Sequence, residues 1–371
     1  MGKSLNLFRI RGIPIGLHPS WFVIFLFLTW SLASGYFAEG SFDLPFGGIW
    51  ILGLITSLLF FGSVLAHELG HAFVALRNNI PVKSISLFFL GGVAEIKREP
   101  DSPGEEFRIA LAGPMVSLAL AVVFNSLAQF SGELPYLAAA FSYLGRVNLL
   151  LGVFNMIPGF PMDGGRILRA AIWKVTGNHY QATQVASFTG RLVAFGFIAF
   201  GVFSVFSGNL GNGIWMGFIG LFLLNLAGSA SAQAKVQQKL DGIRVEQVMS
   251  RNYPSVPGET TLEQLVMATL SDNTQGTYLV LQDDQPAGIL SLGEITKVPR
   301  NLWSRTQAKE VMKSFEKTVQ ISPDTPVLAA LQEMESENLR LVPVVDGLNV
   351  LGVLSRERVL NYLRLRTELG S

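Results

Sequence analysis

The sequence predicts a polytopic α-helical membrane domain of six spans with a membrane-associated β-hairpin, followed by a soluble α/β domain built from two repeats. Three observations lead to this fold class. Residues 1–234 consist mostly of long apolar runs. Residues 235–371 have the composition of a soluble protein, and their motifs recur at a regular spacing. Only 15% of the 371 residues are charged, whereas a soluble domain usually carries about a quarter.

The six spans are predicted from apolar length, because a helix needs about 20 residues to cross a bilayer. The first run is too long for a signal-peptide core and lacks a small-residue cleavage site. The fifth run is short, so its ends are the least defined. The predicted spans are Ser20–Phe37, Gly48–Leu76, Ile109–Phe130, Leu137–Met156, Leu192–Phe206 and Ile214–Ala230.

Lys and Arg are confined to alternate connections between these spans. They precede the first span, lie between the second and third and between the fourth and fifth, and follow the sixth. The connections after the first, third and fifth spans contain neither residue. The positive-inside rule therefore predicts that both termini and the soluble domain are cytoplasmic. We expect an integral, multi-pass protein of a bacterial plasma membrane.

The connection after the second span contains two short β-like runs, Ile85–Phe89 and Val93–Ile96, around the turn residues Gly91 and Gly92. They predict a hairpin that lies beside the bilayer, where protein covers its edge. A plain surface loop agrees equally well with the sequence.

The second span contains the string His67-Glu68-Leu69-Gly70-His71. Two histidines four residues apart lie on one helix face and can share a zinc ion, and the glutamate between them can act as a general base. Such polar groups are costly in lipid and mark a functional site. The chain has no cysteine, so any further metal ligand must be His, Asp or Glu.

A third ligand is expected, because catalytic zinc usually has three protein ligands. Asp163 is the strongest candidate. It follows Pro158 and Pro161, which end the fourth helix, and a broken helix in a membrane is tolerated where it lines a cavity. The alternative is that Asp163 only caps the following helix, Gly164–Val175.

Three other polar residues lie in or near the predicted spans. His18 starts the first span, where an interfacial histidine is favoured over a lid residue. His179 is expected in a polar surface loop. Arg146 falls within the fourth span, where it could pair with an acid, line a cavity or indicate a misplaced span.

The soluble domain repeats itself after about 63 residues. Val248-Met249 recurs as Val311-Met312, and Gly288–Ser291 recurs as Gly352–Ser355. Each half, about 242–298 and 305–365, contains an amphipathic helix and two β-rich runs.

Together these motifs resemble the site-2 protease family of intramembrane zinc metalloproteases, in the branch with C-terminal tandem CBS domains. The resemblance covers essentially the whole chain. It is carried by His67-Glu68-x-x-His71 together with Asn155-x-x-Pro158-x-x-Pro161-x-Asp163-Gly164, and by Gly91–Ile96 and Ala112-Gly113-Pro114.

The resemblance implies one zinc ion per chain, held by His67, His71 and Asp163, with Glu68 activating water. Asn155 would help to position the substrate or its oxyanion, unless it only bonds to backbone at the helix end. The expected substrate is a single-pass regulatory membrane protein, such as a tethered transcription factor or an anti-sigma factor.

The alternative function is a CBS-gated membrane metal transporter without protease activity. Glu68 argues against it, because transport needs no general base. An inactive adaptor is disfavoured because every expected ligand is present. The net charge of +1 and the lack of a dense basic stripe argue against a nucleic-acid partner.

CBS pairs resemble sensors that hold adenine nucleotides, here ATP, ADP or AMP. Ser291 and Glu294 match the family's ribose contact, whereas Ser355 is followed three residues later by Arg358, which departs from it. The alternative is a dimerisation module without a ligand, and a homo-oligomer is plausible in either case. A hinge for regulation is expected in the polar segment Ser229–Asp241.

Overall fold

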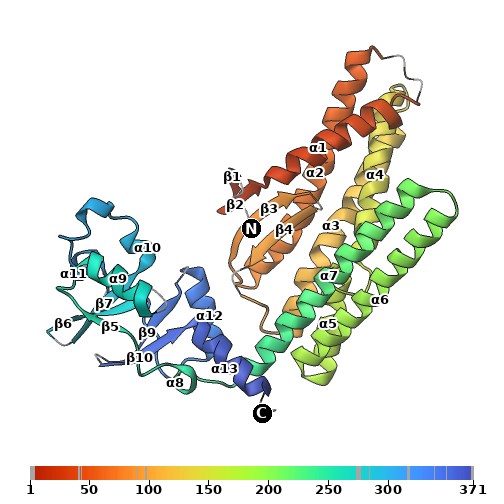
Figure 1. Ribbon diagram of the computed structural model, residues 1–371. Coiled ribbons are helices and arrows are strands. Elements are labelled where there is room, and N and C mark those ends of the chain that lie inside the picture. The colour runs from red at the N-terminus through yellow and green to blue at the C-terminus, as the bar shows by residue number, and fades with distance from the viewer. Residues whose placement is uncertain are drawn as a thin grey trace. The chain divides into compact units, whose positions relative to one another are not determined.

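The computed structural model describes residues 5–40, 42, 44–89, 91–96, 98–272, 277–283, 285–315, 318–337, 339–347 and 349–368. The chain forms two compact units, Met1–Ala234 and Lys235–Ser371 (Figure 1). The first consists mainly of long helices and the second of short strands and helices.

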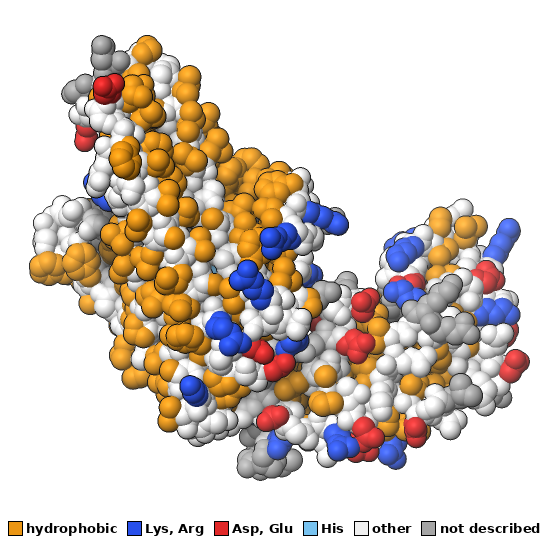
Figure 2. Space-filling view, turned by 180° about the vertical axis from the view of Figure 1, so that it is seen from behind, with side chains coloured by type: hydrophobic (Ala, Val, Ile, Leu, Met, Phe, Trp, Pro, Cys, Tyr) orange, Lys and Arg blue, Asp and Glu red, His pale blue; other side chains and the backbone are white. Residues whose placement is uncertain are grey.

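Six helices in the described residues are long and apolar enough to cross a membrane, as the sequence predicted. The first, α1 (Pro19–Ser31), continues as a π-helical turn, η1 (Leu32–Tyr36). The others are α2 (Phe46–Arg77), α3 (Pro103–Phe130), α4 (Pro135–Asn155), α6 (His179–Phe206) and α7 (Leu210–Leu240). In Figure 2 hydrophobic side chains are spread over the whole visible face of this unit, as expected for a surface in contact with lipid.

The fifth span was predicted too short, because α6 begins at His179 rather than near Leu192. The inner face of its first half consists of small or weakly polar residues, which lower the hydropathy of the segment. Among them are the buried residues Ala182, Thr183, Ala186 and Gly190. A Cβ at Gly190 would lie 1.9 Å from the carbonyl oxygen of Phe160. The small residues of this segment let α6 pack closely against its neighbours, and a search for long apolar runs does not detect them.

A four-stranded sheet joins two distant parts of the first unit. Its order is β1 (Leu5–Ile10), β2 (Ile13–Leu17), β3 (Val82–Phe88) and β4 (Gly91–Ile96). The expected hairpin is β3–β4, which is antiparallel, and β2 pairs with β3 in parallel. The two N-terminal strands were not predicted. Their buried residues Ile13 and Ile15 pack with Ala72 and Ile85, so this sheet lies against α2.

The segment between α4 and α6 contains a further helix, α5 (Asp163–Thr176). It ends at Gly177, which adopts a left-handed conformation with φ of +67°. Helix α5 packs on both α3 and α6, so its first residue is held close to the centre of the unit.

The second unit contains two similar halves. The first has α8 (Val245–Val248), β5 (Ser255–Pro257), α9 (Leu262–Asp272), β6 (Thr277–Gln282), β7 (Gln285–Ser291), α10 (Leu292–Ile295) and η2 (Arg300–Leu302). The second has α11 (Ala308–Val311), β8 (Lys313–Ser314), α12 (Val327–Ser336), β9 (Leu341–Asp346), β10 (Asn349–Ser355) and α13 (Arg356–Glu368). The antiparallel pairs β6–β7 and β9–β10 have matching registers, with Thr277 opposite Ser291 and Leu341 opposite Ser355.

The repeated glycines explain the repeated motifs. A Cβ at Gly288 would lie 2.5 Å from the carbonyl oxygen of Lys313, and a Cβ at Gly352 would lie 2.5 Å from that of Ser250. Each glycine therefore lets the segment that begins the other half approach its strand closely. The two halves need each other for this packing.

The expected hinge at Ser229–Asp241 is wrong in its extent, because Ser229–Leu240 is helical and continues α7. The reason is composition: the segment is rich in Ala, Gln and Lys, which favour helix although they are not all apolar. The helix ends before Asp241, and Gly242 has a φ of +72°.

Candidate metal centre

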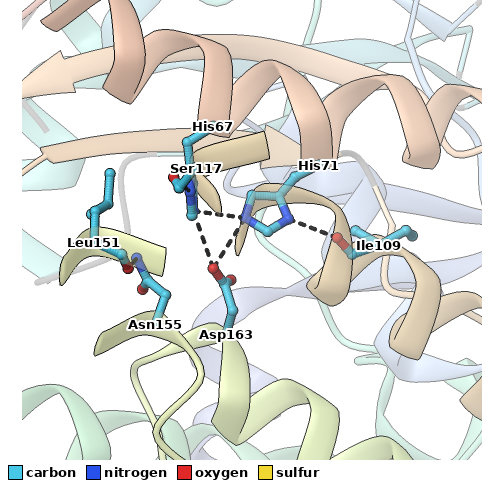
Figure 3. Close-up of polar contacts among 7 residues, drawn as sticks. All are labelled: His67, His71, Ile109, Ser117, Leu151, Asn155 and Asp163. Carbon is cyan, nitrogen blue, oxygen red and sulfur yellow. Dashed lines mark hydrogen bonds and ion pairs between the residues drawn. The ribbon is translucent and has the colours of Figure 1, made fainter. Parts of the chain in front are cut away.

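His67 and His71 lie one turn apart on α2, and both side chains are buried. Their Nε2 atoms are 3.2 Å apart. Figure 3 shows both rings pointing toward the start of α5. The spacing of four residues therefore places two nitrogen atoms on one side of the helix, as predicted.

Each imidazole is oriented by a group on α3. The Nδ1 atom of His71 donates a hydrogen bond to the carbonyl oxygen of Ile109, at 2.7 Å. The Nδ1 atom of His67 lies 2.8 Å from Oγ of Ser117. Because a carbonyl oxygen can only accept, the neutral His71 ring carries its proton on Nδ1, and its Nε2 offers a lone pair. Such partners set the tautomer and ring orientation of metal-binding histidines.

Asp163 is brought to the same point by α5, 92 residues along the chain from His71. Its Oδ2 atom lies 3.2 Å from Nε2 of His67 and 3.2 Å from Nε2 of His71 (Figure 3). The cap residue of α5 is Met162, and no side chain caps this helix end. The alternative in which Asp163 only caps α5 is therefore wrong.

These three atoms are suited to a cation. The Nε2 of His71 and the carboxylate oxygen of Asp163 are both acceptors, yet they lie within contact of each other, which is favourable only with a positive charge between them. Donors arranged tetrahedrally at about 2.0–2.1 Å from a zinc ion would lie roughly 3.3 Å apart. The observed separations are 3.2 Å. The donor set and its spacing therefore fit zinc.

Two glycines make room for this centre, although the sequence suggested only a turn at Gly92 and no contact with the metal centre at Gly113. A Cβ at Gly113 on α3 would lie 2.2 Å from Nε2 of His71 and 2.6 Å from Nε2 of His67. A Cβ at Gly92 on β4 would lie 2.5 Å from Cγ of Glu68. Both positions occur in the motifs that carry the family resemblance, which is the signal that could have identified them.

The three residues border a cavity of about 600 Å³. Glu68, which is half-buried, lies in the wall beside them, as do Asn155 and Arg166. Most residues of β4 form another part of the wall, and apolar side chains from α1, α2, α3, α4 and α7 contribute to the rest. The predicted metal ligands and the predicted general base therefore share one chamber.

Asn155 lines this cavity, but it also makes a bond along its own helix. Its Nδ2 atom donates to the carbonyl oxygen of Leu151, at 3.1 Å (Figure 3). This occupies one of its two N–H groups and leaves the second for another partner. The geometry is thus compatible with both roles considered for Asn155.

The remaining candidates lie outside the metal centre. His18 caps α1, because its Nδ1 accepts a hydrogen bond from the backbone N–H of Ser20, at 3.2 Å. His179 is half-buried at the start of α6, not in a surface loop, and its ring contacts Trp173. Arg146 donates to the hydroxyl of Tyr36, at 2.5 Å, and lies over its ring.

The second unit contains a cavity of about 540 Å³ that is lined by both repeats. Ser291 donates a hydrogen bond to Glu294 in its wall, and Lys297, Lys313 and Arg340 add positive charge. Burial tends to raise the pKa of Glu294, but the Ser291 hydroxyl and the Lys313 ammonium group outweigh it and lower the pKa. The carboxylate is therefore charged at neutral pH and can accept hydrogen bonds.

Comparisons with known proteins agree with this geometry. The model of peptidase family M50 matches residues 55–135 and 133–200, and the CBS domain model matches residues 245–301 and 308–365. A "Putative zinc metalloprotease" of Synechocystis sp. is 33% identical over 377 residues, which cover 98% of this chain and 96% of the relative.

A "Zinc metalloprotease" of Methanocaldococcus jannaschii is 31% identical over 376 residues, which cover 100% of this chain and 99% of the relative. Among solved structures, a site-2 protease of the same organism is 33% identical, with a TM-score of 0.43, over 62% of this chain and 95% of that one. The family models and the two relatives show that the chain belongs to peptidase family M50, the site-2 protease family of membrane-embedded zinc metalloproteases, and carries a tandem pair of CBS domains.

Proposed function

We propose that the protein is an intramembrane endopeptidase that holds one zinc ion with His67, His71 and Asp163 and uses Glu68 as its general base. The observation that carries the proposal is the convergence of two imidazole nitrogens and one carboxylate oxygen, 3.2 Å apart, in the cavity that also contains Glu68. When bound, zinc supplies Lewis-acid polarisation of water and of a peptide carbonyl.

The side chains of the chain supply the remaining chemistry. Glu68 takes a proton from the attacking water and later delivers it to the leaving amine. The free N–H of Asn155 donates to the developing oxyanion, a contribution that can reach ~3 kcal/mol in hydrolases. Gly92 leaves the carboxylate of Glu68 room to move between these tasks, because a Cβ at this position would lie 2.5 Å from Cγ of Glu68.

The substrate is proposed to be a transmembrane segment of a single-pass regulatory membrane protein. Such a segment must unwind before cleavage, because the backbone groups of a helix are engaged in internal hydrogen bonds. Strand β4 is an edge strand and lines the cavity. An unwound segment can add to this edge, where backbone hydrogen bonds would replace those that it lost.

We place the termini, the sheet and the CBS pair on the cytoplasmic side. The charge pattern supports this orientation. It is also supported by the pairing of β2 with β3, which holds the N-terminal segment beside the connection after α2. Reporter fusions after Ala234 should then be cytoplasmic, and fusions near Glu39 and Glu133 should be translocated. A translocated reporter after Ala234 would reverse the orientation.

Regulation by adenine nucleotide at the CBS pair is a further part of the proposal. Ser291, Glu294 and three cationic side chains share one cavity, which suits a ribose and a phosphate chain. At the equivalent place in the second repeat, Nε of Arg358 donates to the carbonyl oxygen of Val248, at 3.3 Å. One site per chain is therefore expected, and calorimetry of the full chain with ATP, ADP and AMP tests it.

The decisive experiment is the variant Glu68→Gln, co-expressed with tagged single-pass candidates. It should retain zinc and lose cleavage by several orders of magnitude, because the amide cannot accept the proton. If Glu68→Gln transports metal ions across the membrane and contains a normal amount of zinc, the alternative of a CBS-gated transporter would be favoured instead. Proteolysis near the wild-type rate in this variant would refute the mechanism.

A further inference from the structure

We infer that Glu106 and Arg169 are positioning residues that hold the proposed third metal ligand in place, an inference that rests on the proposed function. Glu106 lies in the first turn of α3 and is fully buried. Arg169 lies on α5, and its side chain is 11% exposed. Their contact, named here the Glu106–Arg169 clamp, connects α3, which orients both histidines, with α5, which carries Asp163.

The clamp is made by two donors on one oxygen. Nε of Arg169 lies 2.6 Å from Oε1 of Glu106, and Nη2 of Arg169 contacts the same atom. The other oxygen of Glu106 is buried and has no hydrogen-bond partner among the described residues. Burying a charged carboxylate costs free energy unless a positive group pairs with it. The guanidinium of Arg169 is that partner for Glu106.

Arg169 also contacts the loop that leads into α5. Its guanidinium lies over the ring of Phe160, 5.1 Å from the centroid. The backbone N–H of Phe160 donates to the carbonyl oxygen of Ala186 on α6, at 3.0 Å. Because Phe160 precedes Asp163 by three residues, Arg169 restrains α5 both along its length and at its entry.

The other end of the clamp lies near the group that orients His71. Glu106 is one helical turn before Ile109 on α3, and the Ile109 carbonyl accepts the bond from His71. Asp163 lies six residues before Arg169 on α5. The clamp therefore fixes the separation between the helix that orients His71 and the helix that carries Asp163. Neither residue of the clamp touches the three proposed ligand atoms in the described contacts.

Such a role predicts an effect on zinc affinity that is separable from an effect on folding. In the full-length protein in detergent, the zinc dissociation constant can be measured by competition with a chromophoric chelator. Glu106→Gln and Arg169→Met should each weaken zinc binding about 10-fold, the lower end of the range for direct partners of metal ligands, because the clamp acts through the helices. Arg169→Lys should give an intermediate value, because it keeps the charge but loses the two-point contact.

The matched control is Lys174→Gln, which removes a positive charge from an exposed position on the same helix. It should bind zinc as the wild type does. A merely structural pair would lower the unfolding temperature and leave the zinc affinity of the folded fraction unchanged. Wild-type affinity in folded Glu106→Gln would therefore overturn the inference. If that variant fails to fold, wild-type affinity in Glu106→Asp and Arg169→Lys would do the same.

Asp163→Ala, measured in parallel, separates this inference from the proposed function. If Asp163→Ala binds zinc as tightly as the wild type, the ligand set itself is wrong. If Asp163→Ala loses zinc while the clamp variants do not, the ligand set stands and only the clamp is refuted.

Discussion

Gly113→Ala is the sharpest test of the metal centre, because it adds one methyl group to the space between the two imidazoles. The new Cβ would lie 2.2 Å from Nε2 of His71 and 2.6 Å from Nε2 of His67. Ordinary contacts to carbon begin near ~3.5 Å, so atoms must separate by about 1 Å. The hydrogen bonds between His67 and Ser117 and between His71 and Ile109 oppose this movement, since Ser117 and Ile109 lie on α3 with Gly113.

The expected result is a loss of zinc affinity of about 100-fold, the upper end of what misoriented ligands cost, and a similar loss of cleavage rate. Helix α3 itself should not be weakened, because Ala favours a helix over Gly by about 1 kcal/mol. The assay is zinc competition in the purified full-length protein, together with cleavage of a tagged substrate.

Gly104→Ala on the same helix is the matched control. There the nearest atom to a new Cβ is the flexible end of Arg108, at 3.7 Å. This variant should keep wild-type zinc affinity. If Gly113→Ala folds and binds zinc with wild-type affinity, the metal does not lie between these rings and the reasoning fails.

Three further outcomes are expected. Gly92→Ala should lower kcat and keep zinc, because its Cβ would lie 2.5 Å from Cγ of Glu68 and not near the ligands; normal kcat would argue against a mobile base. Ser117→Ala should weaken zinc by ~10-fold through a less restrained His67, with metal content as the check. The pKa of Glu294 is lowered by its partners, so its charged form stabilises the fold above its unfolded-state pKa of about 4.3. That contribution is lost as the pH falls through the lower folded-state pKa. Between the folded-state and unfolded-state pKa values, the unfolding temperature of Glu294→Gln should therefore depend less on pH than that of the wild type.

Local sequence patterns predicted the six spans, the placement of the two histidines and the two repeats, because each pattern can be read from the sequence without knowing the tertiary contacts. Apolar length identified six spans, and the four-residue spacing of His67 and His71 placed both rings on one helix face. The repeat of Val-Met and Gly-x-Leu-Ser identified two similar halves. Hydropathy failed where helix formers are polar or small, as in the start of α6 and the end of α7.

Only the tertiary structure decided which distant segments meet. The sequence made Asp163 a candidate ligand, but its approach to His71 depends on α5 packing against α3. The parallel pairing of β2 with β3 joins residues about 70 positions apart, and no local period encodes it. The close approach at Gly113 and the Glu106–Arg169 clamp exist only where two helices pack together, so the sequence alone does not reveal them. The physical reason is that periodicity reports which face of an element is apolar, whereas close approach depends on the shape and charge of the partner that the face meets.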